Sequence, residues 1–282
     1  RPTTCPLCSS DLPEVDVTHV STLHRGGPLV ADLLQEGITS IADVPRDRLV
    51  HPRQEIQQRA VVEGEPQVDR TALSDFLSRL TFPVLYLDFE ATSSALPPFD
   101  GVHPWEHVPY LYSLHREDED GAVTHHTWMM EPGTDGRREM AERLVADCGN
   151  GGSIVVYSAG FERGILTRLA EHLPDLGDAL TALTERIVDL LEPFHEFVFY
   201  HHDQRGKVSL KTVLPVLTEH DYSAQEVQDG YTANLVYRYL TEQTSDRPLE
   251  ADALLANLVS YCAMDTIAMV HIVRELRVLA GQ

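Results

Sequence analysis

Apolar and polar positions divide the chain into two regions that meet near residue 80. The first region is rich in proline, glycine and short polar turns and has no strong strand pattern. Residues 28–49 have the pattern of a helix, a turn at Gly37 and a second short helix that ends near Pro45, and residues 69–80 have helical spacing. We therefore expect an N-terminal segment, 1–80, that contains a helical hairpin.

From residue 81 onward, strand and helix patterns alternate. Three apolar or alternating stretches predict consecutive strands at 82–89, 108–115 and 122–130. The pattern then predicts a helix, a strand, a helix and a strand, at 135–148, 153–158, 161–173 and 186–191, and a long helix at 250–279. This order predicts an α/β domain over 81–282, with a mixed sheet flanked by helices.

The composition narrows the class of protein. Of the 282 residues, 43% are hydrophobic, which is enough for a packed core. We see no apolar run near the roughly 18 residues of a membrane span, and no secretory signal. Four cysteines are too few for a disulfide scaffold at this size, so we expect a cytoplasmic protein with no membrane partner. Because the chain starts at Arg1 and not at methionine, we expect a fragment or a processed product.

The formal net charge of −22 argues against a broad electrostatic grip on nucleic-acid phosphates. It leaves room for a local site in which metal ions supply the positive charge. The two lysines, Lys207 and Lys211, lie in "RGKVSLK" beside Arg205. This basic stretch is a candidate for binding an anion, and chance loop composition explains it about as well.

Two acids lie at the end of the first predicted strand. The stretch "VLYLDFEAT", which begins at Val84, places Asp88 and Glu90 two residues apart, so both side chains project from one face of the strand. Carboxylates this close repel each other unless a cation lies between them. The sequence therefore offers a metal site here, against the simpler reading of a polar strand end in water.

Two later motifs carry acids that would suit the same site. In "YCAMDTIAMV", Tyr261 and Asp265 are four residues apart and share one face of a helix, and Asp265 falls on an apolar stripe. In "IVVYSAGFERGIL", a strand ends at about Ser158 and Glu162 opens the next helix. Each acid also has a simpler interpretation: Asp265 would be exposed at the margin of the stripe, and Glu162 would be a first-turn acid that the helix dipole stabilises.

Taken together, the three motifs resemble those of the DnaQ-like 3′–5′ exonucleases, in the branch with tyrosine in its third motif (DEDDy). The resemblance covers roughly 82–282, and position 260, where the other branch carries histidine, is serine. The stretches "PFDGVHPWEHVPYLYSLH", "SLKTVLP" and "YCAMDTIAMV" are similar to an uncharacterised bacterial domain that is often fused to RecB-type nucleases. The resemblance implies an RNase H-like fold and, by analogy, an upstream RecB-type domain as partner.

The resemblance also implies a chemistry: metal-dependent 3′–5′ hydrolysis of phosphodiester bonds in single-stranded DNA or RNA, with two Mg²⁺ or Mn²⁺ ions about 4 Å apart. Asp88 would bridge the ions, and Glu90 and Asp265 would complete the first. Glu162 would lie by the second ion. Tyr261 would orient the attacking water, because its ordinary pKa of about 10 makes it a poor base.

The second motif departs from the family pattern. Its usual acid is aspartate, so the longer Glu162 would shift or weaken the second ion. Asp189 stands where the superfamily often has another acid. It would support the site without touching metal, bind metal in place of Glu162, or simply be a strand-end acid in water.

Further residues are candidate contacts, each with a plain alternative. Lys211 would contact a backbone phosphate or be a solvated lysine, and Phe89 and Trp105 would stack on a base or pack on their own domain. The neighbours His201 and His202 are expected to point apart and share no metal. Cys5 and Cys8 form a CxxC pair, which is half of a zinc site, the tail of an Fe–S cluster with other ligands outside this chain, or an incidental pair.

Two other functions fit the same residues. One is an inactive nuclease fold that binds nucleic acid, against which the retained Asp88, Glu90, Tyr261 and Asp265 argue. The other is a phosphohydrolase of nucleotides or short oligonucleotides, which the acidic surface and scarcity of lysine favour slightly over action on long polymers. The sequence does not distinguish DNA from RNA.

Overall fold

The computed structural model describes residues 15–227, 229–242 and 250–282 and divides into two compact units. The first unit comprises the described residues up to Asp69 together with Glu196–Val208, and the second comprises Arg70–His195 and Ser209–Gln282. These units do not coincide with the expected segments 1–80 and 81–282. The helix expected at 69–80 is α4 (Arg70–Leu77), which packs against the C-terminal helix α11 (Ala251–Ala280) of the second unit.

In the residues that the structure describes, the first unit combines two α-helices with several short 3₁₀ turns and a short sheet. The sheet pairs β1 (Gln67–Val68) with β7 (Phe199–Tyr200) in antiparallel register, which is why residues 196–208 join this unit. The helices are α2 (Gly27–Gln35) and α3 (Pro52–Glu63).

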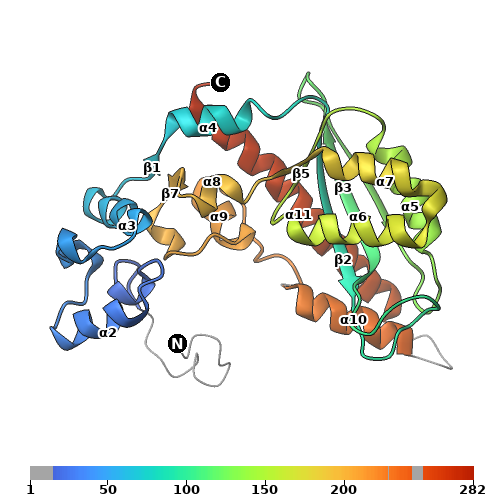
Figure 1. Cartoon of the computed structure of the whole chain (residues 1–282), viewed down its shortest axis with the longest axis horizontal. Coiled ribbons are helices and arrows are strands. Elements are labelled where there is room, and N and C mark those ends of the chain that lie inside the picture. Colours follow the sequence, from blue (N-terminus) through green and yellow to red (C-terminus); the bar gives the residue numbers. More distant parts are fainter. Residues whose placement is uncertain (1–14, 228, 243–249) are drawn as a thin grey trace. The chain divides into compact units, whose positions relative to one another are not determined.

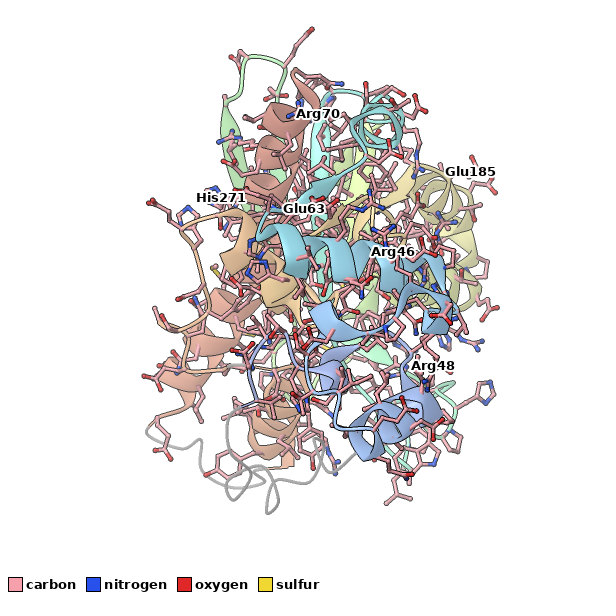
Figure 2. The ribbon with its side chains drawn as sticks, turned by 90° about the vertical axis from the view of Figure 1, so that its left-hand side faces the viewer. Arg46, Arg48, Glu63, Arg70, Glu185 and His271 are labelled. Atoms are coloured by element: carbon pink, nitrogen blue, oxygen red, sulfur yellow. The ribbon has the colours of Figure 1, made fainter. Side chains whose placement is uncertain are left out.

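The expected hairpin in 28–49 is present only in its first helix. In place of the second helix there are two 3₁₀ turns, Ile41–Asp43 and Arg46–Arg48, and Figure 2 labels Arg46 and Arg48 on the latter. Pro45 separates the turns, and because proline lacks an N–H and disfavours a helical residue before it, the two turns cannot merge into one helix.

The second unit contains a five-stranded mixed sheet in the order β4–β3–β2–β5–β6. Strands β2, β3 and β4 form an antiparallel meander, whereas β5 and β6 run parallel to β2. Their bounds are Val84–Thr92, Val108–Glu117, Val123–Met129, Ser153–Val156 and Ile187–Asp189 for β2 to β6 in turn. The predicted α/β fold with a mixed sheet flanked by helices is therefore confirmed.

Helices cover both faces of this sheet. Figure 1 shows α5, α6 and α7 over one face and α11 crossing the other. Helices α8, α9 and α10 also belong to this unit. The bounds are Arg137–Cys148, Gly160–His172, Gly177–Glu185, Glu192–His195, Leu210–Leu217 and Gly230–Glu242 for α5 to α10.

The two faces of β2 have different partners. Leu85, Leu87 and Phe89 pack into the core shared with α5, α6 and α7. Because side chains alternate along a strand, Asp88 and Glu90 point to the opposite face, toward α11. The central strand thus contributes one face to the core and, near its end, two acids to the other layer.

Helix α11 supplies that second layer. Among the described residues, it is the one helix long and apolar enough to cross a membrane by length and composition. Half of its most apolar stretch is buried within the protein, where α11 packs on β2 and β3. Its apolar character therefore fits a core helix.

Candidate metal centre

Three carboxylates converge where β2 faces α11. Asp88 and Glu90 come from β2 and Asp265 from α11, and one ligand atom of each lies within 4.8 Å of the others. The pairing of β2 with β3 shifts register between Glu90 and Ala91, a bulge that re-aims the strand beside the acids. The structure therefore brings together the acids of the first and third sequence motifs.

The cluster is electrostatically unfavourable on its own. Burial and then the repulsion of Asp265 raise the pKa of Glu90 to about 8. Burial raises the pKa of Asp265 to about 6, and burial together with the neighbouring acids raises that of Asp88 well above its ordinary value. Without a cation, the three acids cannot all ionise at low cost, because their negative charges would repel one another. Carboxylate oxygens are also the ligands that Mg²⁺ and Mn²⁺ prefer, so the three acids suit such an ion.

Lys211 supplies positive charge that partly offsets the three carboxylates. It lies in the first turn of α9, and its Nζ donates a hydrogen bond to the Tyr261 hydroxyl at 2.9 Å. The ammonium also lies over the rings of Tyr261 and Tyr222, 4.6 and 5.1 Å from their centroids. Its charge lowers the pKa values of Glu90 and Asp265 against the effect of burial. Lys211 is thus a residue of the cluster rather than a solvated helix-start lysine.

Tyr261 lies between this lysine and the acids. Its side chain is 4% exposed, and its hydroxyl also hydrogen-bonds Asp265. Burial and the three surrounding carboxylates raise its pKa far above the ordinary value of 10. The hydroxyl therefore remains protonated and can act as a hydrogen-bond donor.

Tyr222 belongs to the site although the sequence did not single it out. It lies in the loop after α9, and its hydroxyl donates to Asp265 Oδ1. This bond is the largest effect that lowers the pKa of Asp265. No local spacing could have identified the residue, because it reaches Asp265 only through the packing of α9 on α11.

Tyr222→Phe tests this contact. The variant keeps the ring under Lys211 but removes the donor to Asp265, so we expect Mn²⁺ affinity to fall about 10- to 100-fold, as for other partners of metal ligands. Titration calorimetry with Mn²⁺ measures the change, and Tyr239→Phe, at an exposed tyrosine of α10, is the matched control. Unchanged affinity in Tyr222→Phe would contradict the role.

Glu162, from the second motif, is buried rather than solvated. It lies in the first turn of α6, is 2% exposed, and its Oε2 has no hydrogen-bond partner among the described residues. Burial, with a contribution from the charge of Asp189, raises its pKa to about 8. Its charge also raises the pKa of Asp88, although it lies outside the 4.8 Å group. A buried, unsatisfied carboxylate near Asp88 suits the holding of a further cation.

Asp189 shapes the turn that presents Glu162. At the end of β6, its carboxylate accepts the backbone N–H groups of Ser158 and Leu191 on Oδ1 and of Ala159 on Oδ2, at 2.8–2.9 Å. Ser158 has a φ of 73°, which is uncommon for a residue other than glycine. These bonds hold the start of α6 in place and occupy the carboxylate, which supports a positioning role rather than direct metal binding.

Two other candidates have different surroundings. Phe89 is 3% exposed and lies in the core on the opposite face from the acids, so it is a packing residue and not a substrate contact. Trp105 is 68% exposed in the loop before β3, contrary to the interpretation of a tryptophan packed on its own domain.

The cysteines of the CxxC pair, Cys5 and Cys8, lie outside the described residues. Cys262 is buried, and its Sγ donates to Asp88 Oδ2 at 3.4 Å.

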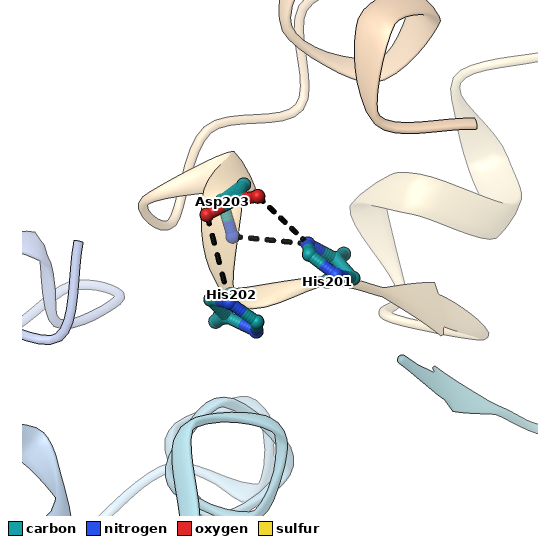
Figure 3. Close-up of side chains that lie close together, drawn as sticks. All are labelled: His201, His202 and Asp203. Carbon is teal, nitrogen blue, oxygen red and sulfur yellow. Dashed lines mark hydrogen bonds and ion pairs between the residues drawn. The ribbon is translucent and has the colours of Figure 1, made fainter. Parts of the chain in front are cut away.

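The histidine pair of the first unit differs from the expectation. The rings of His201 and His202 stack 4.2 Å apart, and with Asp203 they form a second group of possible metal ligands (Figure 3). The expectation that they point apart assumed an extended chain, but His202 begins a 3₁₀ turn that His201 caps. Arg205 and Lys207 also belong to this unit, so the basic stretch around Lys211 is divided between the two units.

The family comparison covers part of this site. Residues 85–209 match the model of a family described as a domain of unknown function (DUF2779). The matched region includes Asp88, Glu90, Glu162 and Asp189 and ends before Lys211 and α11. No curated protein and no solved structure matches the chain. The match is compatible with the expected uncharacterised domain, and function has to be argued from the site.

Proposed function

We propose that this protein is a metal-dependent 3′–5′ exonuclease acting on single-stranded nucleic acid. The observation that carries the proposal is the convergence of Asp88, Glu90 and Asp265 beside the protonated hydroxyl of Tyr261. The order of the motifs resembles that of the DnaQ-like enzymes, and the mixed sheet with acids on its central strand suits an RNase H-like fold. The sequence similarity alone reaches no further than a domain of unknown function.

A purely structural role explains the cluster poorly. Three neighbouring acids with raised pKa values lower the stability of the folded protein, and an exposed strand end would avoid that cost. Perturbed carboxylates that converge with a lysine and two tyrosines are typical of sites that bind ions or perform proton chemistry. One observation supports the alternative of an inactive nuclease fold that binds nucleic acid: Glu162 replaces the usual aspartate.

Each residue of the site would have its own role in hydrolysis. Asp88, Glu90 and Asp265 would hold one divalent ion, and Asp88 with Glu162 a second. When bound, the ions would supply the positive charge that offsets negative charge developing on the phosphoryl group. Tyr261 would turn its single O–H, which contacts Asp265 in this structure, toward the attacking water to orient it, and Lys211 would donate to a phosphate oxygen. Water would add to phosphorus as the 3′ oxygen leaves, giving a nucleoside 5′-monophosphate and a shortened strand.

Labelled substrates test the proposal directly. Single-stranded DNA and RNA carrying a label at either end would be incubated with Mn²⁺, Mg²⁺ or EDTA. We expect stepwise loss from the 3′ end that requires the metal and yields 5′-mononucleotides, and the comparison settles the sugar preference. If folded, metal-bound protein cleaves neither polymer, the exonuclease proposal fails.

A second candidate is hydrolysis of short oligonucleotides. It is favoured by the net charge of −22 and by the presence of only two lysines, which give little electrostatic attraction for a long polyanion. Turnover measured on chains of two to thirty nucleotides separates the two, because a short-chain enzyme loses efficiency as length increases. A binding module would retain strands of any length without cleaving them.

A further inference from the structure

A pocket of about 630 Å³ lies beside the first turn of α6, where Glu162 is located. One wall is the loop 103–107, and the other consists of Gly160, Phe161, Gly164, Ile165 and Arg168 of α6. Its volume falls within the roughly 300–1,000 Å³ typical of small-molecule sites. The residues assigned to metal binding and hydrolysis do not use this pocket.

Aromatic side chains stand exposed at this pocket. Trp105 is 68% exposed and has a φ of 64°, a left-handed conformation that is unfavourable for a bulky residue. The backbone N–H of Trp105 donates to the Ser94 carbonyl at 2.8 Å, which anchors the loop in this conformation. Phe161 is 37% exposed, and the ring of His107 meets it edge-on at 5.4 Å. Strain that keeps an aromatic ring in solvent is more typical of a ligand contact than of packing.

Two glycines keep the floor of the pocket open. Gly160 and Gly164 are four residues apart and therefore share one face of α6. A Cβ added at either position would meet nothing within 4 Å, and neither residue has a positive φ. Glycine is a poor helix former, and here neither backbone conformation nor close packing requires it. The space itself is the remaining physical reason for glycine on this face.

The exposed charge at the pocket is positive. Arg168 lies one turn beyond Gly164, and its guanidinium contacts Glu171 at 2.8 Å in an exposed ion pair. Such pairs contribute little to stability, so a phosphate could replace the partner. The acid of the opposite wall, Glu106, is largely covered: its side chain is 6% exposed, accepts the backbone N–H of His103 at 3.1 Å and lies 2.6 Å from His172 Nε2.

From these features we propose that the pocket binds a nucleotide of the substrate next to the scissile phosphodiester. Its base stacks on Trp105 and Phe161, and its phosphate bonds to Arg168. Aromatic stacking accepts every base, so the pocket confers preference for single strands rather than for a sequence. The identity of the ligand rests on the proposed function, because two lining residues, Gly160 and Phe161, immediately precede Glu162 in the first turn of α6.

Tryptophan fluorescence tests binding without turnover. The chain has two tryptophans, so Trp128→Phe leaves Trp105 as the sole reporter. Titration with a five-nucleotide thymidine strand in EDTA should quench its emission in a saturable manner. In the same background, Gly164→Leu fills the pocket and should weaken binding about tenfold or more, whereas Gly164→Ala, which adds one methyl group, should change it little. Gly164→Leu should fold normally, because the site is open and leucine favours helix.

The outcomes separate the pocket from the catalytic proposal. Saturable quenching that Gly164→Leu reduces, with no cleavage of any strand, supports the pocket and overturns the exonuclease. Metal-dependent cleavage with the same KM in wild type, Trp105→Ala and Gly164→Leu overturns the pocket and leaves the exonuclease intact. Absence of saturable quenching up to millimolar strand, or quenching that Gly164→Leu leaves unchanged, also overturns the pocket.

Discussion

Asp88→Asn is expected to lower metal-dependent cleavage by more than about 10²-fold while leaving the protein folded. Asp88 lies close to Glu90 of β2 and Asp265 of α11, and its pKa is raised by burial and by repulsion from Asp265, Glu90 and Glu162 in turn. Asparagine has nearly the same shape but cannot carry the charge that binds a divalent ion. The measurements are the initial rate on a 3′-labelled strand and the affinity for Mn²⁺.

A matched control distinguishes the site from the overall acidity. Asp178→Asn removes the same charge from an exposed position in α7 and should leave rate and affinity unchanged. In EDTA at neutral pH, Asp88→Asn should melt at the same temperature as the wild type or higher, because one buried repulsion has been removed. If Asp88→Asn keeps half of the wild-type rate, the cluster is not the catalytic centre.

The sheet of the second unit could be predicted because each strand is marked in the sequence by its own run of apolar residues. The apolar run that ends at Leu87 and the short run at Ile154–Val156 are buried on both faces, and helices of clear period separate the later strands.

The sequence of the first unit has no comparable apolar pattern. Helix α3 buries Gln54, Gln57 and Gln58, whose side-chain amides donate to backbone carbonyls of other segments, so no apolar stripe marks it. The pairing of β1 with β7 joins two-residue strands far apart in sequence, which no local pattern predicts.

The site was predictable in its parts and not in its assembly. Spacing of two in a strand and four in a helix placed Asp88 with Glu90 and Tyr261 with Asp265. That β2 meets α11 is a property of tertiary packing, since the contacting Cys262 and Asp88 are 174 residues apart, and only the resemblance suggested it. The inward position of Lys211 follows equally from packing, because its neighbours are on other elements.

The second large effect expected is a pH-dependent stabilisation by metal. The folded pKa values of Glu90 and Glu162, about 8, and of Asp265, about 6, exceed the ordinary values of 4.5 and 3.8. A raised pKa in the folded state means that the folded protein binds more protons than the unfolded chain. The contribution of these groups is therefore fully present below about pH 4 and is lost as pH rises through 6 to 8. In EDTA, the cluster should destabilise the protein progressively over that window.

Divalent metal should reverse this loss because it binds the ionised carboxylates. Its stabilisation should be small at pH 5 and grow toward pH 8, where Mn²⁺ at a hundred times its Kd adds about 2.7 kcal/mol. For a protein of this size that corresponds to a rise in Tm of roughly 5 °C. Thermal melts with Mn²⁺ and with EDTA at each pH provide the measurement. Subtracting the Tm in EDTA from the Tm in Mn²⁺ at each pH removes the opposite pH effect of buried histidines such as His115. Burial lowers the pKa of His115 to about 4, and this effect is the same in both conditions. Asp88→Asn should abolish the difference, and an equal rise at pH 5 and pH 8 would show that the ion binds elsewhere.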